Sequence, residues 1–307
     1  MPEGHVTHRM ASAYRDAFAG GPTRSTSPQG RFAESAALLD GRVLDDAESI
    51  GKHLFVTFGP DIVHVHLGMA GKAFFHHDAP GGQVVETLDE ESEVRSEPAG
   101  RTRPVTGAVR WRLENERAWC DLVGPNACEI VDEAGMDAIA ARLGPDPLRA
   151  DADPSRGWDR VRRSKLPIAA LLMDQRAFAG VGNIFRAEVL YRAGMDPMLP
   201  GVAVTRREFD ALWADLVELM GYALEHGRID TVRPEDTPEA MGRPPRQDRH
   251  GGEVYVYRRA DQPCLRCGTS VRTEVLAARN LFWCPTCQPL SRRKAAVEAR
   301  RAARARR

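Results

Sequence analysis

Two cysteine pairs, Cys264-Leu265-Arg266-Cys267 and Cys284-Pro285-Thr286-Cys287, stand sixteen residues apart and decide the fold of the C-terminal region. This C-x2-C-x16-C-x2-C spacing lies within the range of four-cysteine structural zinc sites. Each pair places two thiolates on one tight turn, and two such turns complete a tetrahedron around one Zn²⁺. The segment between them is too short and too polar to bury a core of its own. We therefore predict a zinc ribbon in which metal binding supplies most of the folding free energy, about 10–16 kcal/mol in comparable peptides.

The residues between the two pairs have the pattern of a β-hairpin, with strands at 271–276 and 281–283 and a turn at 277–280. Two disulfides are the alternative to a zinc site. The other cysteines, Cys120 and Cys128, show no paired spacing, and the start of the chain lacks the apolar stretch of a signal peptide. These observations favour thiolates that bind metal in a cytoplasmic protein over disulfides.

Charge is distributed unevenly along the chain of 307 residues, which is neutral as a whole. From residue 251 to the end there are 13 Lys and Arg against 4 Asp and Glu, a net charge of +9, and the remainder carries −9. A basic zinc ribbon followed by a basic tail is typical of a protein that binds a polyanion. A solvated charge run is the alternative for the tail at 292–307. No apolar run approaches the length of a membrane span.

The first 130 residues or so read as mostly β with one leading helix. An i, i+4 stripe predicts a helix at 3–19, and alternation predicts a hairpin at 54–67 and a strand at 109–113. Tyr14 and Phe18 of the helical stripe are expected in the core. The acidic stretch 86–97 is expected to be an exposed loop.

The middle of the chain reads as helical. Pro167 suits the first turn of a helix that continues to Gln175, and further helices are expected at 184–192 and 209–225. The sequence Gly180-Val181-Gly182-Asn183 ends the first of these helices and separates it from the second. We expect Asn183 to cap the second helix, whose N–H groups suit a phosphate, although an ordinary helical hairpin is the alternative.

The N-terminus, Met1-Pro2-Glu3, adds a weaker signal. Removal of Met1 would expose the secondary amine of Pro2, which forms an iminium directly at a sugar aldehyde carbon. Glu3 beside it would serve as a general acid or base.

These stretches together resemble the formamidopyrimidine-DNA glycosylase / endonuclease VIII family of bifunctional DNA repair glycosylases, over residues 1 to about 289. The matching motifs are MPEG at the start, Gly51-Lys52-His53, HLGMAG at 66–71, LLMDQRAFAGVGNIFRAEVLYRAGMDP at 171–197 and RNLFWCPTCQ at 279–288. The Trp-Cys-Pro form of the last motif looks more like the endonuclease VIII branch, as does the absence of an Arg-Arg-Phe-Gly loop.

The resemblance implies a role for each matching position. Pro2 would attack C1′ of the damaged nucleotide, Glu3 would assist base release, and Lys52 would contact phosphate and move protons while the sugar opens. Met69 would fill the gap left by the everted base, as a flexible apolar side chain can. Phosphate contacts would come from His66, Asn183, Lys165 and Arg279, of which Arg279 would also promote the second elimination.

Two departures from the family pattern bear on the lesion. Val6 stands where many members have glutamate, and Leu122-Val123-Gly124-Pro125 replaces the arginine–phenylalanine wedge of the formamidopyrimidine branch. Both weaken an assignment to 8-oxoguanine. We further expect His64 to have a structural role and Glu188 to pair with a nearby basic side chain.

The sequence thus predicts an α+β multidomain fold: an N-terminal antiparallel β-sandwich with a leading helix, a helical domain with a helix–two-turn–helix motif, and a C-terminal zinc-ribbon hairpin. The expected bounds are 1–134, 135–227, a flexible linker at 228–252, 253–289, and a disordered basic tail at 290–307. The expected function is that of a monomeric, cytoplasmic, nucleoid-associated enzyme without a nucleotide cofactor. It would bind damaged double-stranded DNA, excise oxidised pyrimidines and nick the strand by β,δ-elimination. Alternatives are the same chemistry on oxidised purines, a non-catalytic damaged-DNA binding module, and a general zinc-ribbon partner protein.

Overall fold

The computed structural model describes residues 2–79, 82–88, 93–97, 105, 107–247 and 252–293. Met1, whose removal the sequence suggests, and the end of the basic tail from residue 294 onward lie outside this part. The chain divides into two compact units, Met1–Arg142 and Leu143–Arg307, and each is treated by itself below.

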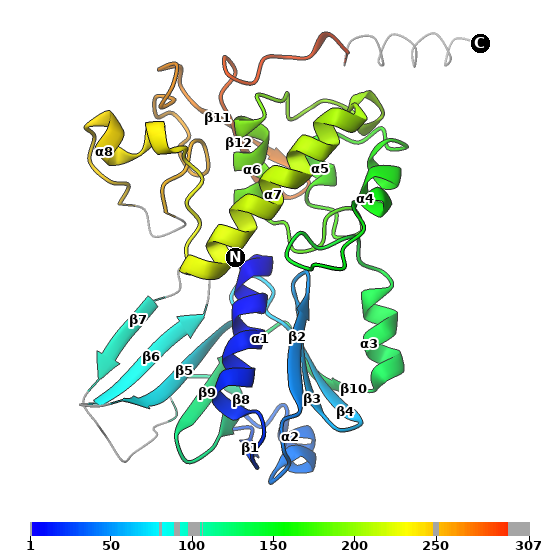
Figure 1. Cartoon of the computed structure of the whole chain (residues 1–307), viewed down its shortest axis with the longest axis vertical. Helices are drawn as coiled ribbons and strands as arrows, with labels where there is room; N and C mark the ends of the chain where they lie inside the picture. The colour runs from blue at the N-terminus through cyan, green and yellow to red at the C-terminus, as the bar shows by residue number, and fades with distance from the viewer. Residues whose placement is uncertain are drawn as a thin grey trace. The chain divides into compact units, whose positions relative to one another are not determined.

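The first unit is built from two antiparallel sheets (Figure 1). Six strands in the order β1-β8-β9-β5-β6-β7 form one sheet, and four in the order β10-β4-β3-β2 form the other. Their bounds are β1 Arg24–Thr26, β2 Asp46–Ile50, β3 His53–Phe58, β4 Asp61–His66, β5 Lys72–Ala79, β6 Gly82–Leu88, β7 Glu93–Glu97, β8 Val109–Glu114, β9 Ala118–Val123 and β10 Ala127–Val131. The predicted sandwich is confirmed.

Helix α1 (Gly4–Phe18) packs on β2 and β3 and also reaches strands of the six-stranded sheet. Its predicted stripe is buried: Val6, Met10 and Tyr14 have no exposed surface and Phe18 has 1%. The Tyr14 ring stacks on Trp111 of β8, with ring centroids 5.5 Å apart. The core of this unit therefore lies between α1 and the inner faces of the two sheets.

Three features of this unit differ from expectation. In its described residues, 86–88 and 93–97, the acidic stretch is not a loop but belongs to β6 and β7, which pair at the edge of the six-stranded sheet, where Val85 and Leu88 are fully buried. Two helices were not foreseen, α2 (Ala33–Leu39) and α3 (Glu133–Ala140). Since α3 packs against β4 and β10, the first unit continues to Arg142, beyond the expected boundary at 134.

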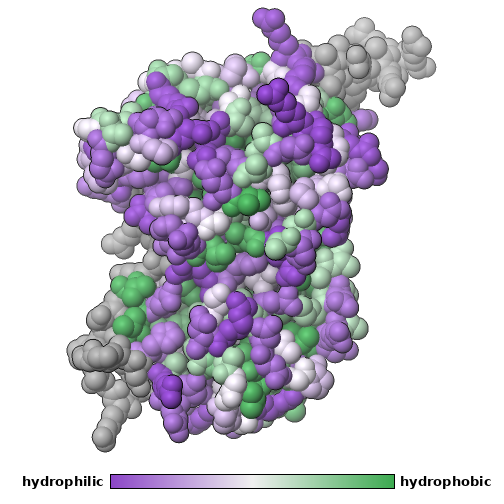
Figure 2. Space-filling model, viewed as in Figure 1, coloured by the Kyte–Doolittle hydropathy of each residue, from purple (hydrophilic) through white to green (hydrophobic). Residues whose placement is uncertain are grey.

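The second unit is a helical core that carries the zinc hairpin (Figure 1). Its helices are α4 Pro154–Val161, α5 Ile168–Leu171, α6 Asn183–Arg192, the 3-10 turn η1 Gly201–Ala203, α7 Arg206–His226, η2 Pro234–Asp236 and α8 Pro238–Met241. Helix α7 starts with a capping box in which Thr205 and Glu208 bond each other's backbone. On the face shown in Figure 2, hydrophobic residues are scattered among hydrophilic ones, as on an ordinary protein surface.

The expected flexible linker at 228–252 is instead largely folded over its described residues. Ile229 and Thr231 are fully buried, and η2 and α8 occupy 234–241. Side-chain carboxylates hold the segment in place: Asp230 accepts the backbone N–H of Glu253 at 2.7 Å, and Glu253 accepts that of Arg246 at 2.6 Å. The linker was predicted from a composition rich in Pro, Arg, Asp and Gly, and composition does not show which side chains form these contacts.

The predicted hairpin of the ribbon is confirmed as β11 (Arg272–Leu276) and β12 (Arg279–Trp283). Leu276 pairs with Arg279, so the turn consists of Ala277 and Ala278 alone and is shorter than the predicted turn at 277–280. Both have positive φ, +51° and +59°, as the right-handed twist of a two-residue hairpin requires.

Candidate active site and zinc centre

The start of α1 and the β2–β3 turn lie together at one end of the first unit. The Thr7 hydroxyl, in the first turn of α1, donates to the Gly51 carbonyl at 2.9 Å. Pro2 and Glu3 directly precede that turn of helix, and both are buried. Glu3 occupies the N-cap position, but its carboxylate does not cap the helix.

Lys52 owes its position to a two-residue hairpin turn. Ile50 pairs with His53, so the turn consists of Gly51 and Lys52, and Gly51 takes the positive φ of +63° that a type II′ turn needs at this position. Lys52 is half-buried. The hydrogen bond from Thr7 therefore brings Lys52 to the same end of the unit as Pro2 and Glu3.

The β4–β5 turn lies at this end too, because His66 at the end of β4 pairs with His53 at the start of β3. Gly71 N–H donates to the Leu67 carbonyl at 3.0 Å. A Cβ on Gly71 would lie 2.4 Å from that carbonyl oxygen, so the turn requires glycine there. Met69 at the turn is 67% exposed, as a side chain that enters a DNA stack would need to be.

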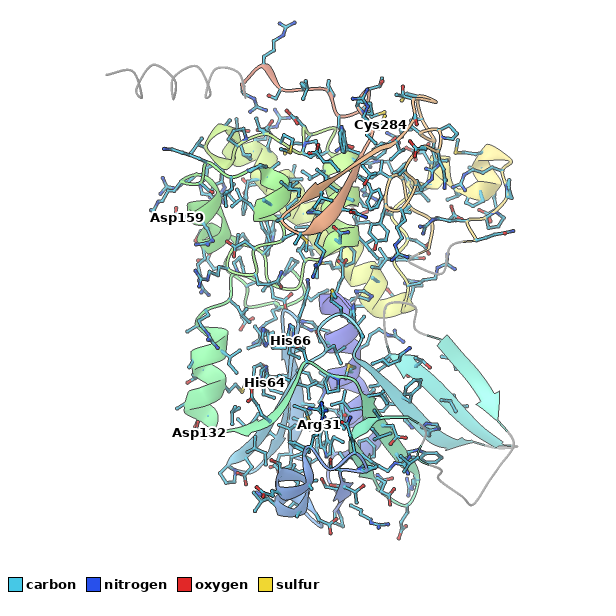
Figure 3. All side chains as sticks on the ribbon, turned by 180° about the vertical axis from the view of Figure 1, so that it is seen from behind. Arg31, His64, His66, Asp132, Asp159 and Cys284 are labelled. Carbon is cyan, nitrogen blue, oxygen red and sulfur yellow. The ribbon has the colours of Figure 1, made fainter. Side chains whose placement is uncertain are left out.

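Three histidines line the outer face of the four-stranded sheet. Figure 3 shows His64 and His66 along β4, and the ring of His53 on β3 contacts both, with centroids 5.1 and 4.9 Å away. Burial lowers the pKa of His53 to about 3, and the charges of His66, His64, Arg142 and Lys52 add to the effect. Burial also lowers the pKa of His66, followed by the charges of His64 and Lys52. The rings of His53 and His66 are therefore neutral at physiological pH.

His5 was also missed by sequence reasoning. It is fully buried in the first turn of α1, and burial followed by the charge of Arg9 lowers its pKa to about 3. The charge of Lys52 contributes as well, which places Lys52 near this turn. The i, i+4 stripe of α1 does not include residue 5, so only the fold revealed the burial of this imidazole.

In the second unit, Asn183 is oriented by the zinc hairpin. The N-cap of α6 is Gly182 and not Asn183, so the predicted cap is wrong: Asn183 is the first helical residue. Its amide donates to the Asn280 carbonyl at 3.1 Å. The fully buried Arg186 donates to the Asn183 side chain and, at 2.9 Å, to the same carbonyl.

Gln175 shapes the turn before α6. Helix α5 ends at Leu171. Gln175 therefore lies outside the helix, contrary to the prediction that the helix continues to this residue. Its amide donates to the Val181 carbonyl at 3.0 Å and accepts the Gly180 N–H at 3.0 Å. This side chain therefore fixes the turn that precedes Asn183.

The two other predicted DNA-contacting residues of this unit reach its surface at separate places. Arg279, at the start of β12, is half-exposed, and its guanidinium donates to the Ala278 carbonyl at 3.1 Å. Lys165 is exposed in the segment between α4 and α5. The hairpin contacts α6, and the bond from Asn183 to Asn280 ties Asn183 to the neighbour of Arg279.

Glu188 does not pair with a basic side chain, contrary to expectation. Its fully buried carboxylate accepts the Thr231 hydroxyl at 2.6 Å and three successive backbone N–H groups, those of Tyr255, Val256 and Tyr257, at 2.7 to 2.9 Å. It thus joins α6 to the chain that enters the zinc ribbon.

The four predicted cysteines converge. Their sulfur atoms all lie within 4.8 Å of one another, with Cys264 and Cys287 at 3.8 Å and Cys267 and Cys284 at 3.4 Å. Tetrahedral Zn–S bonds of about 2.3 Å imply sulfurs roughly 3.8 Å apart. All are free thiols, so the disulfide alternative is wrong. The set fits one structural Zn²⁺; in Figure 3, Cys284 marks this centre.

Neighbouring groups hold the zinc ligands in place. The Tyr191 hydroxyl of α6 lies 3.0 Å from Cys264 Sγ. Gln288 accepts the Cys284 N–H at 3.0 Å and donates to the Met195 carbonyl at 3.1 Å. Hydrogen bonds of this kind orient metal ligands.

Comparison with known proteins accounts for this arrangement. The chain matches the Formamidopyrimidine-DNA glycosylase N-terminal domain over residues 1–118, its H2TH domain over 143–234, and the zinc finger found in FPG and IleRS over 261–290. Endonuclease 8 1 of Mycobacterium tuberculosis is 46% identical over 289 residues, which cover 94% of this chain and 100% of that protein. The chain belongs to the formamidopyrimidine-DNA glycosylase / endonuclease VIII family.

Other relatives carry names from both branches of the family. A DNA-(apurinic or apyrimidinic site) lyase of Mycolicibacterium smegmatis is 31% identical, covering 95% of this chain and all of that protein. A formamidopyrimidine-DNA glycosylase of Chloroflexus aurantiacus is 35% identical, covering 83% of each. As a member of this family, on its endonuclease VIII branch, the chain is a DNA glycosylase and AP lyase of base excision repair.

Solved structures of the family share the fold. The Lactococcus lactis Fpg in complex with DNA containing an abasic site has a TM-score of 0.71 at 19% identity, over 94% of this chain and 100% of that one. The MutM (Fpg) protein of Thermus thermophilus has a TM-score of 0.68 at 26% identity, with the same coverage.

Proposed function

We propose that this enzyme excises oxidised pyrimidines from double-stranded DNA through a Schiff base on Pro2, and that it then nicks the strand by β,δ-elimination. The observation that carries the proposal is the hydrogen bond from Thr7 to Gly51. It brings the start of α1, with Pro2 and Glu3, to the turn that carries Lys52.

The chemistry follows from these groups. With Met1 removed, the Pro2 nitrogen attacks C1′, the damaged base leaves with a proton, and the ring oxygen is released as a hydroxyl while the iminium forms. Glu3 is the group that moves protons in this step. The iminium acidifies C2′, so a base removes that proton and phosphate leaves from C3′. Loss of a second proton then expels phosphate from C5′.

Backbone contacts would hold the DNA in place for this chemistry. His66 and Met69 lie at the same end of the first unit as Lys52. In the second unit, Asn183, Lys165 and Arg279 would bind phosphates, which fix the position of the protein on DNA but carry no base sequence. Zinc would act structurally by keeping the hairpin with Arg279 folded.

Borohydride trapping tests the nucleophile. Borohydride reduces the iminium to a stable crosslink, so wild-type protein, with Met1 removal checked by mass, should become covalently attached to lesion-containing duplexes. A Pro2→Leu variant, whose bulky second residue retains Met1, should give no crosslink while binding an uncleavable abasic analogue as wild type does. A wild-type protein with a proline N-terminus that never crosslinks would favour the non-catalytic binding module.

The lesion is tested separately, because the relative of Chloroflexus aurantiacus is named a formamidopyrimidine-DNA glycosylase. Single-turnover excision should be faster on duplexes with thymine glycol or 5-hydroxycytosine than on matched duplexes with 8-oxoguanine. Faster excision of 8-oxoguanine would support the oxidised-purine alternative.

A further inference from the structure

The outer face of the four-stranded sheet carries a hydrogen-bonded chain of side chains from three strands. Register places His64 of β4 opposite Phe55 of β3 and Glu129 of β10. His64 Nδ1 lies 3.1 Å from the Glu129 carboxylate, and His64 Nε2 lies 2.9 Å from His53 Nδ1. One exposed carboxylate and two imidazoles thus form a continuous chain.

The carboxylate determines where the protons sit. Glu129 is acceptor-only when ionised, so His64 must donate from Nδ1. When His64 carries a single proton, its Nε2 has a lone pair, which accepts from His53 Nδ1–H. It follows that His53 carries its proton on Nδ1 and presents Nε2 as an acceptor. A bond made by one ring nitrogen fixes the role of the other.

The chain ends beside the proposed active site. His53 directly follows Lys52 in sequence, and its ring lies 4.9 Å from that of His66, centroid to centroid. The titratable groups that face His53 are His66 and His64 of β4, Arg142 after α3, and Lys52. Within the described residues the four cysteines are the sole group of three or more ligand-type side chains close enough together to hold a metal ion.

We propose that Glu129, His64 and His53 form a positioning relay that fixes the tautomer of His53, whose Nε2 accepts a hydrogen bond from Lys52 or His66 and so holds these two residues for the lyase step. The proposal rests on the proposed function. His53, His64 and Glu129 are positioning residues in it, since they act through Lys52 and His66.

Packing alone does not account for this chain. His64 is 5% exposed, and an imidazole buried beside Phe55 costs free energy unless both nitrogens are bonded. A hydrophobic residue would fill the same space at a lower cost in free energy, as Phe55 and Ile62 do further along the same face, where they pack against Ile139 of α3.

The tautomer is measured directly by ¹⁵N NMR of the histidine rings, which needs no activity. In wild type, His53 should show a protonated Nδ1 and a bare Nε2. Glu129→Gln should convert His53 to a mixture of tautomers, because a glutamine amide can either donate to or accept from His64. Glu133→Gln, which removes the same charge four residues later on exposed α3, should leave the His53 signals unchanged.

The role in the reaction is measured on duplexes with a preformed abasic site, where no base needs to be excised. His53→Phe keeps the ring but loses both nitrogens, and we expect elimination to slow about tenfold through misplacement of Lys52 and His66. His53→Gln retains an acceptor near the Nε2 position and should return to within about threefold of wild type. Affinity for an uncleavable abasic analogue should stay within about twofold in both, which separates positioning from binding.

His77→Phe is the matched control, since His77 lies on β5 and packs on Phe75 outside the relay. Three results would overturn the proposal: wild-type elimination by His53→Phe, no rescue by His53→Gln, or unchanged His53 tautomers in Glu129→Gln. If wild type itself never crosslinks DNA, the proposed function fails, whereas the tautomer measurement still decides whether the relay exists.

Discussion

Replacing Glu188 with glutamine should destabilise the second unit. In Glu188 one carboxylate oxygen accepts the N–H groups of Val256 and Tyr257, and the other accepts the Thr231 hydroxyl and the N–H group of Tyr255. The glutamine NH₂ must replace one oxygen. The orientation that costs less free energy places the NH₂ toward Thr231 and Tyr255. The Thr231 hydroxyl can rotate to accept from it, whereas the Tyr255 N–H cannot and loses its acceptor.

The magnitude follows from that geometry. One buried backbone N–H left without an acceptor costs about 1–3 kcal/mol, and the two bonds that remain lose the charge that made them strong, about 1 kcal/mol each. Removing the buried charge recovers part of its desolvation cost. We expect a net loss of about 3 kcal/mol, a large fraction of the roughly 5–15 kcal/mol that stabilises a domain.

Urea unfolding at fixed zinc concentration measures this loss, and amide hydrogen exchange at residues 255–257 locates it. Glu218→Gln is the control: that carboxylate is 68% exposed in its pair with Arg192, so its removal should change the free energy of unfolding by about 0.5 kcal/mol or less. A loss below about 1 kcal/mol for Glu188→Gln, or protection unchanged at 255–257, would refute the assignment of Glu188 as the anchor of this segment.

Three further predictions concern metal, turn and pH. Chelation of zinc should unfold the ribbon and abolish binding to lesion-containing DNA while circular dichroism shows the β-rich first unit intact; tight binding by metal-free protein would contradict this. The double change Ala277→Asn, Ala278→Gly should stabilise the hairpin by about 1–2 kcal/mol, because both positions have positive φ. The variant should then release zinc at a higher urea concentration than wild type. Release at a lower urea concentration would show that the alanines are not strained. The pKa of His5 is lowered from 6.5 to about 3 by burial, so the unfolded chain binds the proton more readily. The stability from this group is complete above pH 6.5 and is lost as pH falls toward 3, by roughly 5 kcal/mol at most. His5→Gln should flatten the dependence of the urea midpoint of the first unit over this range, and an unchanged slope would exclude His5 as its cause.

Local patterns determined much of this molecule. Two cysteine pairs predicted the zinc ligands because a C-x2-C turn brings its own two sulfurs together without help from the rest of the chain. The stripe of α1 and the hairpin of β3 and β4 followed from periodicity, since each element buries one face. The motifs also pointed to the family before any fold was known.

Contacts between residues distant in sequence required the tertiary structure. Composition suggested a linker at 228–252, yet Glu188, more than forty residues before Thr231, holds that region folded. Asn183 looked like a helix cap, but its amide bonds Asn280, 97 residues away. His53, His64 and Glu129 lie on three strands, and only the register of those strands joins them. A side chain's local pattern determines which element it occupies, whereas its hydrogen-bond partners depend on how the elements pack, and packing is a property of the whole unit.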